Sequence, residues 1–171
     1  MSPKLKAFLA TAPLLFGFDF WSKQAVVEHL GPRDELVLVP GWLSFVHAEN
    51  PDAAFSMPVP DSVLFVGAGL ALVLLVHTLW MIDRGARLQA GAVACLLAGA
   101  AGNAFDRAVD GSVTDFVMVH ANGSPALRTW LVERFGTATW PIFNVADSCI
   151  VVGIALFAIA ALMERDDPAT A

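Results

Sequence analysis

The sequence predicts an all-α membrane protein, a bundle of four transmembrane helices with a small β-rich segment at one membrane surface. Two observations carry this prediction. The composition is 57% hydrophobic and only 15% charged, with a mean hydropathy of +0.65. Four apolar stretches are also long enough to cross a hydrocarbon core about 30 Å thick, which takes roughly 20 helical residues each.

The 171 residues leave little chain beyond these spans, so we expect one compact domain. The predicted spans cover about 7–27, 62–82, 88–109 and 141–163. The segments 28–61 and 110–140 then lie at the membrane surface. The formal charge of −6 argues against nucleic acid as a partner.

The first span begins after Lys4 and Lys6, a start that is also typical of a secretory signal peptide. The apolar run continues past any cleavage site as far as Asp19 and Lys23, so we interpret it as an uncleaved span. Asp19 and Lys23 are four residues apart and can form an ion pair on one helix face. Such a pair either fastens the helix end or supports a polar site nearby.

The segment 28–61 contains two short β-type runs, 35–39 and 42–47, between proline and glycine residues. This pattern predicts one or two hairpin strands at the membrane surface. The apolar side chains of this segment suit either a lid that faces lipid or a loop with aromatic anchors; they are Trp42, Phe45, Phe55 and Met57.

The third span carries small residues at four-residue spacing, which allow close helix approach and predict the central helix of the bundle. Asn103, Asp106 and Arg107 share one face near its end. We expect the Asp110–Gly111 turn to end the helix and to release a strand at 113–119 that carries Asp115.

A polar segment at about 122–139 leads to the fourth span, where Pro141 suits the first helical turn. Asn144, Asp147 and Ser148 share one face, and Asp147 is expected a turn or two inside the span. His77, in the second span, is interpreted as an interfacial residue.

The basic residues predict the orientation of the chain. Lys4, Lys6, Arg84, Arg87 and Arg165 fall on one side, close to span ends, and Arg33, Arg128 and Arg134 fall on the other. The positive-inside rule therefore predicts that both termini are cytoplasmic. Asp115 and Asp147 then face outward, near the same membrane surface.

Two adjacent carboxyl groups share a proton, because both cannot ionise cheaply. One can then activate a water molecule while the other polarises a carbonyl group, as in aspartic proteases. Asn103 and Asn144 offer amide donors, and Arg107 offers a cation. The spacing permits Asp115 and Asp147 to meet, but an Asp106–Arg107 ion pair with solvated carboxylates elsewhere is equally consistent with it.

Other functions are favoured less. A proton relay or transporter would place carboxylates at several depths and usually shows internal repeats. A non-catalytic anchor does not account for so many polar groups, and nothing sets Ser148 and His120 in a triad order. Cys95 and Cys149 lie in apolar segments and are interpreted as small hydrophobic residues. The common metal and nucleotide motifs are missing, so we expect no metal or cofactor.

Four motifs resemble those of the lipoprotein signal peptidase (signal peptidase II) family, in order along nearly the whole chain. They are DFWSK at 19–23, NPDAAFS at 50–56, GNAFDRAVDGSVTDF at 102–116 and FNVADS at 143–148. The resemblance implies a bacterial inner-membrane aspartyl protease with four spans. It would cut prolipoproteins before a cysteine that already carries diacylglycerol.

By motif position, the resemblance makes Asp115 and Asp147 the catalytic aspartates. It also implies a set of residues that shape the site or contact substrate: Asp19, Lys23, Asn50, Asn103, Asp106, Arg107, Asn144 and Ala146. Implied partners are the lipidated prolipoprotein, membrane lipid and inhibitory cyclic peptide antibiotics, with the enzyme a monomer. The chain departs from the family in two places, since Asp52 replaces a glycine and the segment 119–140 is longer than usual.

Overall fold

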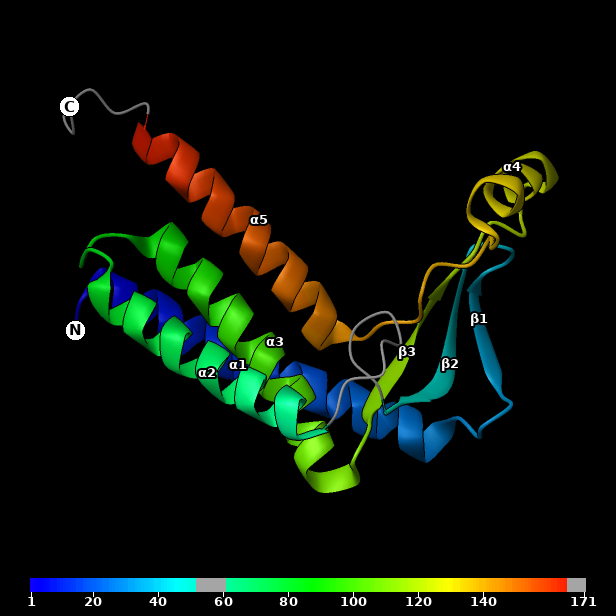
Figure 1. Ribbon diagram of the computed structural model, residues 1–171, viewed down its shortest axis with the longest axis horizontal. Helices are drawn as coiled ribbons and strands as arrows, with labels where there is room; N and C mark the ends of the chain where they lie inside the picture. The colour runs from blue at the N-terminus through cyan, green and yellow to red at the C-terminus, as the bar shows by residue number, and fades with distance from the viewer. Residues whose placement is uncertain (52–60, 166–171) are drawn as a thin grey trace.

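The computed structural model describes residues 1–51 and 61–165, which form five helices and a three-stranded sheet. The chain order is α1 (Pro3–His29), β1 (Glu35–Val39), β2 (Leu43–Asn50), α2 (Asp61–Met81), α3 (Arg87–Asp110), β3 (Val113–Val119), α4 (Pro125–Phe135) and α5 (Val145–Arg165). Four long helices lie together, and the sheet leads away from one end of them (Figure 1). The predicted spans at 7–27, 62–82 and 88–109 thus coincide with helices α1, α2 and α3.

Helix α3 is the centre of the bundle, as its small residues predicted, and contacts α1, α2 and α5. Gly99 faces the backbone of α5 so closely that an added Cβ would collide with the carbonyl oxygen of Ala146. At Gly153 on α5, an added Cβ would lie 2.7 Å from Leu96. The helices therefore approach each other through glycine on both sides, and this contact fixes the start of α5 against α3.

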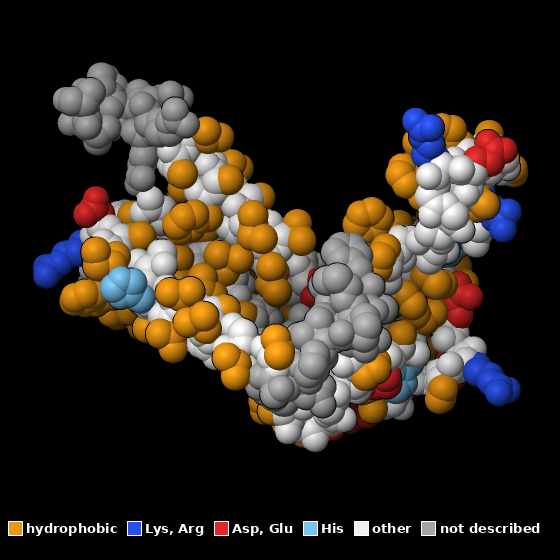
Figure 2. Space-filling view, viewed as in Figure 1, with side chains coloured by type: hydrophobic (Ala, Val, Ile, Leu, Met, Phe, Trp, Pro, Cys, Tyr) orange, Lys and Arg blue, Asp and Glu red, His pale blue; other side chains and the backbone are white. Residues whose placement is uncertain are grey.

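The apolar surface of the helices matches a protein that faces lipid. Within the described residues, α3 and the stretch Val145–Met163 of α5 are long and apolar enough to cross a membrane, and Val66–Met81 is a shorter apolar stretch. Large apolar side chains cover the outside of the helices (Figure 2), among them Val66, Val73 and Val151, which are 71%, 65% and 66% exposed. Apolar surface of this extent marks contact with a membrane or a partner.

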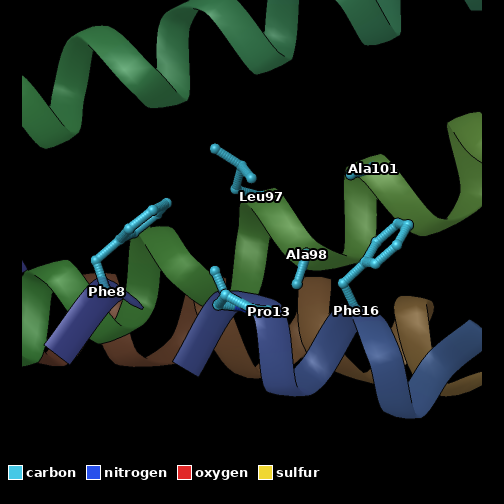
Figure 3. A pocket seen from close by; sticks show the side chains of 7 residues that line it. Phe8, Pro13, Phe16, Leu97, Ala98 and Ala101 are labelled. Atoms are coloured by element: carbon cyan, nitrogen blue, oxygen red, sulfur yellow. The ribbon is translucent and has the colours of Figure 1, made fainter. Parts of the chain in front are cut away.

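Helix α1 contains Pro13, whose ring removes one backbone donor from the helix interior. Beside it, an apolar hollow lies between α1 and α3 (Figure 3). Its lining residues are Phe8, Ala12, Pro13, Phe16, Leu97, Ala98 and Ala101. All seven are apolar, so the hollow offers no group for chemistry.

One end of the bundle gathers the start of α1 and the end of α2. Lys4 Nζ donates to the carbonyl oxygens of Leu79, Trp80 and Ile82 at 3.0, 3.1 and 2.6 Å. A cation placed there meets the unpaired carbonyls and the negative dipole of the helix end. The end of α5 lies at this same end of the bundle, opposite the sheet (Figure 1).

The sheet is antiparallel, in the order β1-β2-β3. The predicted run 35–39 is β1, and the run predicted at 42–47 is β2 at Leu43–Asn50. Gly111, with φ 75°, ends α3 in the left-handed conformation and lets the chain turn directly into β3, as predicted. Phe45, which was expected to be exposed, is half-buried. Its ring packs edge-on against the ring of Phe116, with the ring centroids 5.4 Å apart. Phe55 and Met57 lie outside the described residues.

Two predictions about the chain before α5 were wrong or incomplete. Pro141 does not begin the helix, because Phe143 still pairs with β3: Val117 N–H donates to the Phe143 oxygen at 2.8 Å. The segment predicted only as polar contains helix α4. Its signals are present in the sequence, since Ser124 caps the first turn, Pro125 follows, and Gly136 ends the helix at φ 77°.

Candidate active site

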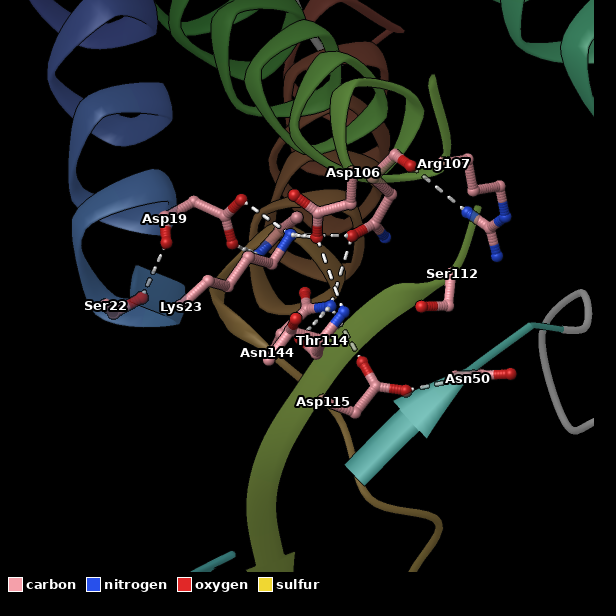
Figure 4. A network of polar contacts seen from close by, with 12 residues as sticks. Asp19, Ser22, Lys23, Asn50, Asp106, Arg107, Ser112, Thr114, Asp115 and Asn144 are labelled. Carbon is pink, nitrogen blue, oxygen red and sulfur yellow. Dashed lines mark hydrogen bonds and ion pairs between the residues drawn. The ribbon is translucent and has the colours of Figure 1, made fainter. Parts of the chain in front are cut away.

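Asp115 lies on β3, the strand that leaves the end of α3, and only 4% of its surface is exposed. Both of its oxygens accept hydrogen bonds from amides, Oδ2 from Asn50 Nδ2 at 2.9 Å and Oδ1 from Asn144 Nδ2 at 2.8 Å (Figure 4). Burial, together with the nearby charge of Asp147, raises the pKa of Asp115 from 3.8 to about 6. Asp115 is therefore a carboxyl group that can hold a proton close to neutral pH.

Asp147 lies in the first turn of α5, not one or two turns inside it as predicted. Asn144 and Asp147 form a reciprocal capping box. Asp147 N–H donates to Asn144 Oδ1 at 2.9 Å, and Asn144 N–H donates to Asp147 Oδ2 at 3.1 Å. A carboxylate at a helix N-terminus is favoured by the helix dipole. The spacing N-x-x-D is a capping signature that the sequence analysis interpreted only as a polar face.

Asn144 connects the two carboxyl groups and is fully buried. Its side chain donates to Asp115 and to the Asn103 Oδ1 at 3.1 Å, while its backbone binds Asp147. Asn103 Nδ2 in turn donates to Asp147 Oδ1 at 2.8 Å. Each aspartate thus has a hydrogen-bonding partner on another element, and the two amides hold both carboxyl groups in one network.

Lys23 is the cation at the centre of a second, adjoining network. Its Nζ lies 2.8 Å from Asp19 Oδ2 and 2.8 Å from Asp106 Oδ2, and it donates to Asn103 Oδ1 at 3.1 Å. Figure 4 shows Asp19 and Lys23 reaching from α1 toward Asp106 on α3. The Asp19–Lys23 pair supports the polar site as well as joining the helices, and Asp106 pairs with Lys23.

Ala146 connects the Lys23 network to α5 by a hydrogen bond. Its backbone N–H donates to Asp19 Oδ1 at 2.7 Å, and its side chain is fully buried. Gly102 on α3 lies directly against the Asp19 carboxylate, since an added Cβ at this position would collide with Asp19 Oδ2. Asp19 therefore holds the first turn of α5, one residue from Asp147.

Arg107 donates through Nη1 to the Asn103 carbonyl oxygen at 3.3 Å. Its guanidinium lies on the side of α3 away from Lys23 (Figure 4). The structure thus gathers Asp19, Lys23, Asn50, Asn103, Asp106, Asn144, Ala146 and Asp147 around Asp115, with Arg107 at the edge. Asp52 lies outside the described residues.

Four contacts near the site, made by Thr114 and Glu49, had no signal in the sequence. Thr114 N–H donates to Asp106 Oδ2 at 3.4 Å, and the Thr114 carbonyl accepts from Asn144. Glu49, beside Asn50, accepts from Ser112 Oγ and pairs with His47 at 2.9 Å. The Thr114 contacts join β3 to α3 and to the residue before α5, and the Ser112 contact joins β2 to the turn before β3, so each of them depends on how the chain folds after α3. In the described parts of the chain, no group of three acidic, histidine or cysteine side chains is arranged to bind a metal.

The fold places the chain in a class of bacterial membrane enzymes. A solved structure of a bacterial membrane enzyme matches with a TM-score of 0.79 and 25% identity, over 94% of this chain and 90% of the other. A second structure described in the same words matches with a TM-score of 0.76 over 94% of both chains.

Sequence relatives identify the family within that class. A lipoprotein signal peptidase of Solibacter usitatus is 34% identical over 90% of this chain and 89% of its own. A lipoprotein signal peptidase of Dichelobacter nodosus is also 34% identical, over 95% of this chain and 97% of its own. The family model of signal peptidase (SPase) II matches residues 11–163. The chain belongs to the signal peptidase II family.

Proposed function

We propose that this protein is a membrane aspartyl endopeptidase that removes the signal peptide from prolipoproteins, with Asp115 and Asp147 as its catalytic pair. Membership of the signal peptidase II family supports the peptidase activity. The substrate class follows from relatives that are named lipoprotein signal peptidases. Cleavage would fall just before a cysteine that carries diacylglycerol.

The observation that carries the catalytic assignment is the sharing of Asn144 by both carboxyl groups. Asp115 accepts from the Asn144 side chain and Asp147 from its backbone, at 2.8 and 3.1 Å. The pKa of Asp115 near 6, raised by burial and by Asp147, suits it to carry the shared proton. Asp147, at the start of α5, then carries the negative charge.

The chemistry follows from this division. Asp147 takes a proton from a water molecule as the water attacks the scissile carbonyl carbon, and Asp115 donates its proton to the carbonyl oxygen. Collapse of the tetrahedral intermediate breaks the C–N bond: Asp147 passes the water proton to the leaving amine, and Asp115 takes back a proton from one hydroxyl of the intermediate, which leaves the product acid. Asn103 and Asn144 hold the carboxyl groups in place for both steps.

The remaining residues support this pair. Asp19, Lys23 and Asp106 position the start of α5 through Ala146, and Asn50 orients Asp115. Arg107 lies at the edge of the site, where it can contact substrate or an inhibitory cyclic peptide.

We propose that α1, α2, α3 and α5 span the bacterial inner membrane, with the β-rich segment at its outer surface. Basic residues gather at the end of the bundle that holds Lys4, Arg84 and Arg87, which supports cytoplasmic termini. The two aspartates lie at the opposite end, near the periplasmic face. Each of them belongs to the same chain, so the site requires one copy, and we propose that the enzyme acts as a monomer.

The test is cleavage of a lipidated prolipoprotein by purified Asp115→Asn and Asp147→Asn variants in detergent or nanodiscs. Each variant should lose at least about a thousandfold in rate, since a general acid or base contributes about 10²–10⁴-fold and the pair acts as a unit. The control is Asp110→Asn, which neutralises an exposed carboxyl group at the end of α3. Full activity of either Asp115→Asn or Asp147→Asn, with the fold intact, would refute the assignment of these two residues as the catalytic pair.

A further inference from the structure

Helix α4 is well formed, and most of its side chains are exposed in the described structure. Ser124 Oγ accepts from Leu127 N–H at 3.4 Å, and Gly136 closes the other end. None of the 11 residues of α4 is buried against the rest of the described structure. A helix of this length is marginal by itself in water, so its apolar side chains require a covering surface.

Four of the five large apolar side chains of α4 share one side of the helix; Val132 lies outside this group, and Arg134 lies within it. Leu127, Trp130, Leu131 and Phe135 follow the spacing i, i+3, i+4, i+8, which places them together on a helix. Trp130 and Phe135 are 54% and 66% exposed, and their ring centroids lie 5.9 Å apart. We call these four residues the α4 apolar face.

The charges of α4 fit a lipid surface better than a protein partner. Arg134 follows Leu127 by seven residues, so it shares the apolar face, and Arg128 borders it. Thr129 and Glu133 lie on the opposite side. An arginine within an apolar face can bury its stem and extend its guanidinium to lipid phosphates. An apolar protein surface would have to bury the same charges without partners.

The three-stranded sheet connects α4 to the helix bundle (Figure 1). The sheet leads sideways from the ends of the helices, and α4 lies at its far end (Figures 1 and 2). The base of α4 is fixed, because Gly123 N–H donates to the Gly41 oxygen at 2.7 Å and Gly123 lies against the indole of Trp42. Trp140, between α4 and α5, is 63% exposed and suits the interfacial belt where α5 enters the bilayer.

We infer that α4 is an interfacial helix whose apolar face enters the headgroup region of the bilayer, with Arg128 and Arg134 bound to lipid phosphates. The bundle holds one end of the sheet in the membrane, and α4 holds the other end at its surface. β3, which carries Asp115, runs between these two attachments. The inference needs the chain to be a membrane protein, but it does not depend on the catalytic roles of the aspartates.

Depth measurements on the full chain in nanodiscs test this inference directly. In a Cys95→Ala, Cys149→Ala background, a nitroxide is attached at Leu131→Cys, and separately at Glu133→Cys as the matched control. The nanodiscs contain phosphatidylethanolamine and phosphatidylglycerol. We expect the label at 131 to be relaxed mainly by oxygen, which dissolves in lipid, and the label at 133 mainly by a water-soluble nickel chelate.

Two results would overturn the inference. Equal access of the nickel chelate to both labels would place α4 in water. Shielding of position 131 from both reagents, with spin–spin broadening between copies, would make a second copy of the chain the occupant.

A functional comparison separates lipid contact from catalysis. Leu131→Asp should lower cleavage several-fold in liposomes and leave cleavage in detergent unchanged, whereas Thr129→Asp, with the same charge on the opposite face, should change neither. Equal losses for both variants in liposomes would contradict the inference. Loss of all activity by the Asp115→Asn variant bears only on the catalytic assignment, because label depth needs no turnover.

Discussion

Replacement of Lys23 by methionine tests how far the site depends on its buried ions. The Lys23 ammonium lies 2.8 Å from a carboxylate oxygen of both Asp19 and Asp106, and these three side chains are 2%, 2% and 11% exposed. Methionine keeps most of the side-chain volume but leaves the two carboxylates without a cation. Removing one partner of a buried ion pair destabilises a protein by about 3–5 kcal/mol.

We expect the loss of stability in Lys23→Met to fall within this range rather than above it, because each of the two carboxylates keeps a backbone hydrogen-bond donor. Ala146 N–H still binds Asp19 at 2.7 Å, and Thr114 N–H binds Asp106 at 3.4 Å. For a chain of this size, each kcal/mol lowers Tm by about 2–4 °C, so we expect a decrease of roughly 6–20 °C. This decrease in Tm can be measured by thermal unfolding in detergent, with tryptophan fluorescence as the signal. Lys6→Met, at an exposed position of the same helix, should stay within about 0.5 kcal/mol of the parent.

The decisive comparison adds Asp19→Asn and Asp106→Asn to Lys23→Met. Because the uncompensated charges disappear with the lysine, the triple variant should recover more than half of the lost stability. Asp106→Asn alone should lower stability while the folded protein keeps its cleavage activity. The reasoning is refuted if Lys23→Met loses less than about 1 kcal/mol, or if the triple variant is no more stable than the single one.

Two further predictions concern the site and the helix contact. The pKa of Asp115 is raised to about 6, so its protonated form declines as pH rises, and kcat/KM should fall through an apparent pKa near 6 on the basic side. The folded state also holds a proton that the unfolded chain releases between pH about 4 and 6, so this group's contribution to stability decreases as pH rises over that window. Asp115→Asn should therefore gain stability relative to the parent above pH 6; a constant difference from pH 4 to 8 would contradict this. Gly99→Ala should destabilise by about 1–3 kcal/mol and slow cleavage, because its Cβ collides with Ala146 beside Asp147. Gly91→Ala, where an added Cβ meets nothing within 4 Å, should be neutral or stabilising by up to about 1 kcal/mol, and equal stability of the two variants would be inconsistent with the packing.

Local signals in the sequence account for most of the helices and strands. Long apolar runs predict α1, α2 and α3, and the Asp110–Gly111 turn predicts where α3 ends and β3 begins. Helix α4 was missed because its residues have little separation of apolar and polar faces over the whole helix. The cap residues Ser124 and Gly136 were its available signals.

The site itself could be predicted only in part, because its contacts join distant segments. Motif resemblance pointed to Asp115 and Asp147, but spacing alone left a meeting of the two unproven. Their link through Asn144 requires α5 to start at Val145, and the ladder between Phe143 and Val117 decides that start. Pro141, a good first-turn residue, suggested an earlier start that strand pairing overrides.

The positions of the two carboxyl groups depend on different parts of the fold. Asp147 is fixed by helix packing, since Asp19 of α1 binds the adjacent Ala146 N–H and Asn103 of α3 binds its carboxylate. Asp115 is fixed by the sheet, because Asn50 on the neighbouring strand binds it. A movement of the sheet relative to the helices would therefore change the distance between the two carboxyl groups, with Asn144 as the contact between both parts. If α4 holds the far end of the sheet at the membrane surface, the lipid bilayer itself contributes to the geometry of the acidic pair.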